Sequence, residues 1–121
     1  MSLNDVAKEL VAGCREGRET ENLDKLYAAD AVSVESLDMG QGRETHGLEG
    51  IRGKHAWWDS TFEVMEANVS DPFPHGEDRF AVTFDVKAKN KETGEVTDMS
   101  EIAVYHVADG KITREEFFYG P

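Results

Sequence analysis

The chain has 121 residues, of which 39% are hydrophobic and 31% charged, a balance typical of one globular domain spanning residues 1–121. Its 25 acidic and 13 basic residues give a formal net charge of −12. Nucleic acids and anionic membranes bind through clustered lysines and arginines, so this balance argues against both as partners. The sequence has neither an apolar run of roughly 20 residues nor a signal-peptide start, and we expect a cytoplasmic protein.

Helical patterns dominate the first half of the chain. A first helix carries apolar residues at helical spacing and ends before Gly17. The only cysteine, Cys14, falls on its apolar face and is expected to be a small buried side chain. A shorter second helix is predicted around Leu23 and Leu26, and a third from about residue 48 to 60.

Strand patterns dominate the second half. The segments predicted as strands are 31–35, a stretch through Met65, Ala67 and Val69, and then 79–90, 96–107 and 111–119. The last three form an antiparallel meander, because a polar turn and the Asp109-Gly110 pair typical of hairpins join them. The segments 38–47 and 75–78 are predicted as a loop and a turn. Helices gathered before an antiparallel sheet indicate an α+β domain.

Strand alternation predicts which side chains face the interior of this domain. If Ala103 points inward, the expected inward set is Phe84, Met99, Glu101, Tyr105, Glu115, Phe117 and Tyr119, joined by His55 and Trp58 from the third helix. Glu116 would replace Glu115 if the register slipped by one residue. Burying a carboxylate costs several kcal/mol unless it is paired or protonated. Inward glutamates are therefore candidates for function rather than for packing.

Three stretches resemble the NTF2-like superfamily, closest to its SnoaL-like polyketide cyclases and ketosteroid isomerases. They are Tyr27-Ala-Ala-Asp-Ala-Val-Ser-Val-Glu35, Gly47-Leu-Glu-Gly-Ile51 and Asp109-Gly-Lys-Ile-Thr-Arg-Glu-Glu-Phe117. The resemblance implies a cone-shaped, cystatin-like fold, in which three N-terminal helices pack on a curved, mostly antiparallel sheet around a small-molecule pocket. It also implies that a homodimer is common. Members include isomerases, cyclases, dehydratases, hydrolases and proteins that only bind, so fold leaves activity open.

The resemblance to ketosteroid isomerases also implies site residues. Their general-base aspartate ends the first strand, and the matching position here is Glu35. Their oxyanion hole uses a tyrosine on the first helix and a protonated acid on a later strand, which fall here at about Leu10 and Ala103. Neither side chain can donate a hydrogen bond. The steroid-isomerising machinery of the family is therefore incomplete in this chain.

Two functions are left open. The first is a cofactor-independent isomerase, cyclase or dehydratase on a small apolar or carbonyl compound, with Glu35 or Glu101 as general base and His55 or Tyr105 as its partner. The second is a pocket that binds an apolar molecule without turnover, or a domain that serves dimerisation. Glycine-rich phosphate loops and cysteine or histidine metal motifs are absent from the sequence, so we expect neither cofactor nor metal.

The outward face of the meander predicts self-association. Alternation places Ile102, Val104 and Phe118 together on that face. An exposed apolar patch of this kind marks an interaction surface. We therefore expect a homodimer.

Overall fold

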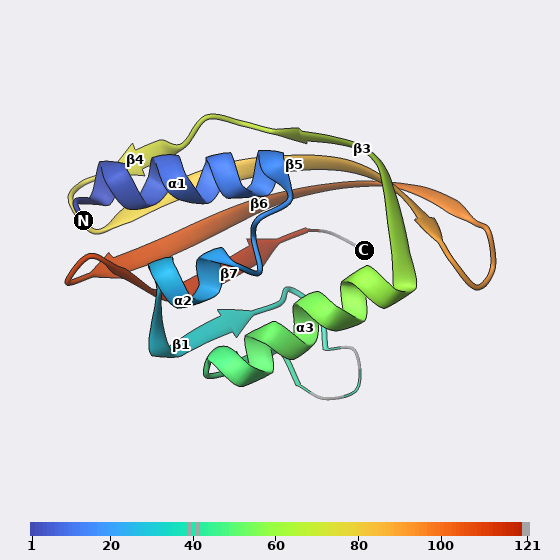
Figure 1. Cartoon of the computed structure of the whole chain (residues 1–121), viewed down its shortest axis with the longest axis horizontal. Helices are drawn as coiled ribbons and strands as arrows, with labels where there is room; N and C mark the ends of the chain where they lie inside the picture. The colour runs from blue at the N-terminus through green and yellow to red at the C-terminus, as the bar shows by residue number, and fades with distance from the viewer. Residues whose placement is uncertain (39, 41, 120–121) are drawn as a thin grey trace.

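Helices pack on one side of a single mixed sheet in this structure, a computed structural model that describes residues 1–38, 40 and 42–119. The helices are α1 (Leu3–Glu16), α2 (Asn22–Leu26) and α3 (Leu48–Thr61). The strands are β1 (Tyr27–Val34), β2 (Glu44–His46), β3 (Phe62–Val69), β4 (Phe73–His75), β5 (Arg79–Asn90), β6 (Val96–Ala108) and β7 (Lys111–Phe118). Figure 1 shows α1 lying along β5 and α3 lying beside β1.

The sheet has the strand order β2-β1-β7-β6-β5-β3, and β4 adds to β5. β1 and β7 pair in parallel, while the other neighbours pair antiparallel. The β5–β6–β7 meander is therefore confirmed, and so is the α+β, cystatin-like fold. The parallel pair brings the end of β1 beside the end of β7, where Val34 pairs with Glu116, although 82 positions (116 − 34) separate these two residues in the chain.

Residues next to α1 in the sequence determine where the helix begins and where it ends. Ser2 and Asp5 form a reciprocal capping box at its start, which satisfies two backbone N–H groups that the helix leaves free. Gly17 ends it in the left-handed conformation, with φ of 74°, which glycine adopts without a Cβ clash. In the described part of the chain, no helix combines the length and apolar character needed to cross a membrane.

The core lies between α1, α2 and the inner face of the sheet. Val6, Leu23, Leu26 and Ile112 are completely buried there. Phe80 of β5 stacks on Tyr105 of β6 with ring centroids 4.9 Å apart, an arrangement that adds to the free energy gained from burying both rings.

Three predicted boundaries are corrected. β1 begins at Tyr27 rather than at residue 31, because Tyr27 pairs with Ile112 of β7. The predicted loop 38–47 contains β2, and the proline segment before the predicted turn contains β4. Strands of three residues are too short to show alternation, and a proline is tolerated in β4 because it lies at the sheet edge.

Replacing Phe80 with alanine is expected to lower the free energy of unfolding by about 3–5 kcal/mol, because it removes a fully buried ring and leaves a cavity. Urea unfolding followed by circular dichroism measures this loss. Phe73 is 58% exposed, so Phe73→Ala is the matched control and should change the value by no more than about 0.5 kcal/mol. Equal losses in the two variants would contradict this assignment of the core.

Candidate functional site

Polar side chains form rows across the inner face of the sheet, because paired strands set residues side by side. In the first row Ser33 of β1 lies beside Glu115 of β7, and Glu115 lies beside Tyr105 of β6. Four residues along β6 from Tyr105, Glu101 lies beside Phe84 of β5. At about 3.4 Å per residue, the two glutamate rows are about 14 Å apart along β6. Ala103 and Tyr105 of β6 and Glu115 of β7 are buried, so the strand faces that carry them point into the core.

Glu115 is the buried acid of the first row, with only 3% of its surface exposed. Its carboxylate accepts a hydrogen bond from the Tyr27 hydroxyl and another, 2.6 Å long, from Ser33 Oγ. Burial raises the pKa of Glu115, and these two hydrogen bonds oppose that rise. Both carboxyl oxygens thus have partners inside the core.

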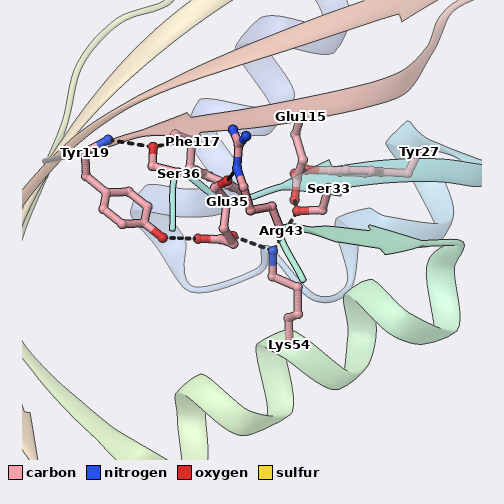
Figure 2. A network of polar contacts seen from close by, with 9 residues as sticks. All are labelled: Tyr27, Ser33, Glu35, Ser36, Arg43, Lys54, Glu115, Phe117 and Tyr119. Carbon is pink, nitrogen blue, oxygen red and sulfur yellow. Dashed lines mark hydrogen bonds and ion pairs between the residues drawn. The ribbon is translucent and has the colours of Figure 1, made fainter. Parts of the chain in front are cut away.

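Lys54 of α3 connects this buried acid to the end of β1, as Figure 2 shows. Its Nζ donates to Ser33 Oγ at 2.8 Å and to Glu35 Oε2 at 2.5 Å. The other Glu35 oxygen accepts from the Tyr119 hydroxyl at 2.9 Å. A continuous chain of polar contacts therefore leads from the core at Tyr27 to Tyr119.

The backbone around Glu35 and Tyr119 is fixed by hydrogen bonds between the ends of β1 and β7. Ser36 Oγ donates to the Phe117 carbonyl oxygen at 2.5 Å and accepts from the Tyr119 N–H at 3.1 Å. Arg43 Nε donates to the Glu35 carbonyl oxygen at 2.9 Å. The carboxylate and the phenol thus meet because both strand ends are tied together.

Glu101 differs from the other two glutamates. Within the described chain, no hydrogen bond reaches its carboxylate, and every buried polar side-chain atom has a partner. The oxygens of this half-buried side chain must therefore contact solvent. Burial raises the pKa of Glu101 to about 7, helped by the negative charges of Glu35 and Glu115. Glu101 can accept or release a proton near neutral pH.

The two tyrosines of the core are poor proton donors. Burial raises the pKa of Tyr27 and of Tyr105 well above the ordinary value, and the nearby Glu115 charge adds to the rise. Burial also raises the pKa of Tyr119, as does its hydrogen bond to Glu35.

The thiol of Cys14 stays protonated at neutral pH, because burial raises its pKa to about 12.

His55 and Trp58 of α3 have partners other than the glutamates. His55 Nδ1 lies 3.0 Å from Thr20 Oγ1, and burial lowers the pKa of His55. Trp58 packs against Phe62, with ring centroids 4.6 Å apart. The structure thus brings Glu35 near Glu101, while His55 pairs with a threonine of the α1–α2 connection.

A groove of about 500 Å³ opens where β7 ends beside the longer β6. It is lined by Thr83, Asp85, Ser100, Glu101, Ile102, Phe118 and Tyr119. A smaller hollow of about 250 Å³ involves Met99 and polar residues of β3, β5 and β6. Of the predicted catalytic residues, Glu101 lines the larger groove, whereas Glu35 and His55 are not among its lining residues.

The other predicted pocket residues have packing roles. Phe117 lies under the Lys54 ammonium, 5.5 Å from Nζ to the ring centroid, which is a cation–π distance. Phe84 packs against the core, while Tyr105 and Glu115 are buried in it. Of the site residues predicted from the sequence, Glu101 and Tyr119 are the two that line the groove.

Lys54, Ser33 and Tyr27 complete the network and are not among the residues predicted from the sequence. Lys54 follows the buried Ile51 by three positions, so it shares the side of α3 that faces the sheet. Ser33 alternates with Val32 and Val34 and thus lies on the same face of β1 as Glu35. Within the described residues, no group of three or more His, Cys, Asp or Glu side chains is arranged to hold a metal ion.

The sequence pattern of the SnoaL-like domain matches residues 1–119 of the chain. A Mesorhizobium loti protein, provisionally named a SnoaL-like polyketide cyclase, is 34% identical in sequence and superposes with a TM-score of 0.91. That match covers 98% of this chain and 100% of the other. No curated protein is significantly similar in sequence.

More distant structures share the fold and were crystallised with small molecules. TerC, in crystals with polyporic acid, is 21% identical with a TM-score of 0.73, over 96% of this chain and 89% of its own. A Mycobacterium tuberculosis protein in complex with estradiol-17β-hemisuccinate is 17% identical with a TM-score of 0.76, over 99% of this chain and 95% of its own. At these low sequence identities, the two structures are evidence for a shared fold only.

The raised pKa of Glu101 predicts a pH-dependent stability. The folded chain holds this proton more tightly than the unfolded chain, so the free energy of unfolding should fall as pH rises from about 4.5 to about 7. Glu101→Gln removes this contribution, and its stability relative to the wild type should grow by up to about 3 kcal/mol over that range.

Urea unfolding at pH 5 and pH 7.5 measures the difference. Glu92→Gln, in the exposed turn between β5 and β6, removes the same charge and should show a constant offset from the wild type. If Glu101→Gln also kept a constant offset, Glu101 would titrate at an ordinary pH in the folded protein.

Proposed function

Since the chain belongs to the SnoaL-like domain family, we propose that it binds a small, largely apolar molecule and performs acid–base chemistry on it without a cofactor. Glu101 is the general base. The reaction class is isomerisation, cyclisation or dehydration, each of which begins with removal of a proton from carbon. The observation that carries the proposal is the unpaired, solvent-reaching carboxylate of Glu101 beside the Glu35–Tyr119 pair.

Glu101 suits the role of base better than Glu35. The Glu35 carboxylate accepts hydrogen bonds from Lys54 and Tyr119, so both of its oxygens are engaged. Glu101 has a pKa of about 7, where a general base combines basicity with sufficient ionisation at neutral pH. Glu35 and Lys54 then act as positioning residues that hold Tyr119.

The proposed step balances without a redox partner. Glu101 takes a proton from the carbon next to a carbonyl group, so the C–H bond breaks and an O–H bond forms on Glu101. The electron pair moves to the carbonyl oxygen as an enolate. The Tyr119 hydroxyl, which donates to Glu35 in the free protein, turns to donate its hydrogen bond to the enolate instead. Return of the proton to another carbon completes an isomerisation.

A second candidate is a binding protein without turnover. The groove at Glu101 is open to solvent rather than enclosed. Enzymes of this chemical class gain much of their rate by excluding water from the site. An open groove therefore favours binding, and the exchange experiment below separates the two candidates.

The first test is deuterium exchange at the carbon next to the carbonyl of 2-tetralone, a compact apolar ketone, followed by NMR in D₂O. The wild type should accelerate exchange above buffer, with a rate that rises with pH through about 7 as Glu101 ionises. Glu101→Gln should lose the acceleration by about 10²–10⁴-fold.

Two variants control this test. Glu92→Gln should keep the full exchange rate. Glu35→Gln should slow exchange less than Glu101→Gln does, because it alters the placement of Tyr119 and leaves the base intact. If the wild type bound 2-tetralone but left exchange at the buffer rate, the second candidate would be the better account.

The apolar patch on the outer face carries the proposal of a homodimer. Ile102 of β6 and Phe118 of β7 are directly paired, and they are 48% and 51% exposed. Ile102→Lys should convert the protein from twice the 13.5 kDa mass of the chain to a monomer, because a charge would be buried without a partner.

Light scattering at micromolar concentration measures the mass. Val64→Lys introduces the same charge at a similarly exposed aliphatic position of β3 and should leave the dimer intact. A wild-type mass equal to one chain would contradict the homodimer.

A further inference from the structure

We infer that the proposed homodimer packs with the strands of its two copies antiparallel, and that acid tightens it by charging a row of histidines. The row lies on the outer face, the side of the sheet away from the helices. This inference deepens the homodimer proposal and rests on it. It is carried by the strand register, which sets three of the four histidines of the chain in one line.

The row crosses the outer face near the turn between β6 and β7. In the order of their pairing, its members are His75 of β4, Arg79 of β5, His106 of β6, Arg114 of β7, Val32 of β1 and His46 of β2. Residues paired across strands carry their side chains on the same face. Val104 and Ile102 of the apolar patch follow on that face, two and four positions from His106 on β6. The row therefore flanks the patch that the homodimer covers.

Carboxylates accompany the histidines of the row. His106 Nε2 lies 2.9 Å from Glu116 Oε1, and His46 Nε2 lies 3.0 Å from Glu44 Oε1. Glu116 and Glu44 belong to the next row of the face, in which both pair with Val34. Each of these two histidines forms an ion pair when it is protonated.

The arginines of the row also have acidic neighbours. Arg79 Nε lies 3.5 Å from Asp78 Oδ1, and Arg114 Nε lies 3.7 Å from Glu116 Oε2. Two arginines against three carboxylates, Glu44 included, give this end of the face a net charge of −1 while the histidines are neutral. Three protonated histidines bring it to +2. Histidine is the side chain that ordinarily gains its charge between about pH 8 and pH 5, so acid reverses the sign of this end.

The opposite end of the outer face is acidic. Its charged side chains are those of Glu66 of β3, Asp85 and Lys87 of β5 and Asp98 of β6. Three carboxylates against one lysine give a net charge of −2, and in the row beyond them the charges of Glu63 and Lys89 cancel. Carboxylates are ordinarily ionised above about pH 5, so this end keeps its charge while the histidines titrate.

Symmetry decides which ends of the two copies meet. Two identical sheet faces pack about a two-fold axis that lies in the plane between them, and each contact then occurs twice. His106 and Asp98 lie four positions from Ile102 on β6, in opposite directions and about 14 Å away. An axis across the strands at Ile102 sets His106 of one copy over the partner's Asp98. An axis along the strands sets His106 over the partner's His106.

The charges favour the axis across the strands, which makes the strands of the two copies antiparallel. In acid this axis sets an end of +2 over an end of −2, whereas an axis along the strands sets each end over its own copy. Opposite charges gain more where an interface excludes water. At pH 8 the two ends carry −1 and −2, so the attraction arises only as the histidines become protonated.

The test is the dissociation constant of the dimer, measured by sedimentation equilibrium at pH 8 and pH 6. An ionic strength of 0.15 M, with a Debye length of about 8 Å, limits the effect of the overall charge of −12. The wild-type dimer should bind about tenfold more tightly at pH 6. His106→Gln, which takes up no proton, should lose most of this tightening. His55→Gln, which removes the histidine outside the row, should keep it.

Glu101→Gln controls for the other group that titrates in this range. Glu101 lies on the opposite face of β6 and has a pKa of about 7, so this variant should keep the tightening. Asp98→Lys brings the acidic end from −2 to 0 and should remove it. Glu49→Lys makes the same change in net charge on α3, where the Glu49 side chain is 95% exposed, and should keep it.

The outcomes separate this inference from the homodimer proposal. A dimer that binds equally at both pH values, or more weakly at pH 6, would overturn the inference and leave the homodimer standing. Tightening that survives in both His106→Gln and Asp98→Lys would also overturn it. A wild-type mass equal to one chain at both pH values would overturn the homodimer and the inference together.

Discussion

Lys54 supplies the positive charge that the glutamates of the inner face share, and the arrangement of the site depends on how it is shared. Its ammonium contacts Glu35 directly and Glu115 through Ser33. A buried carboxylate persists only with such partners, because desolvation costs several kcal/mol. α3 is therefore held to β1 by a polar contact at the point where the strand ends.

Glu35 and Glu115 both have hydrogen-bond partners, whereas the Glu101 carboxylate has none among the described residues. Partial burial, helped by two negative neighbours, raises the pKa of Glu101 to about 7, while the network fixes Glu35 and Tyr119 nearby. A fold that hosts many activities differs among its members in such details. In this chain, Leu10 and Ala103 are buried apolar residues, and polar groups lie at the ends of β1 and β7.

Local pattern was sufficient to predict the meander and to place Glu101 on the same strand face as Ala103 and Tyr105, because side chains alternate along a strand. That this face points inward was an assumption made for Ala103. Alternation could not predict Lys54 as a partner of Glu35, since that contact depends on how α3 docks on β1. The open groove was equally hidden, because it arises from β7 ending before β6 does. The short strands β2 and β4 depend on pairing with β1 and β5, and pairing is a tertiary property.

The account rests on the ionisation of Glu101, and a carboxyl ¹³C NMR titration measures it directly. The Glu101 resonance is identified by its loss in Glu101→Gln, and an exposed glutamate such as Glu92 serves as the internal reference. A midpoint near pH 7 for Glu101 is the predicted result. A midpoint near 4.5, the ordinary value for a glutamate, would mean that Glu101 is an ordinary solvated acid and would contradict its role as the base of the site.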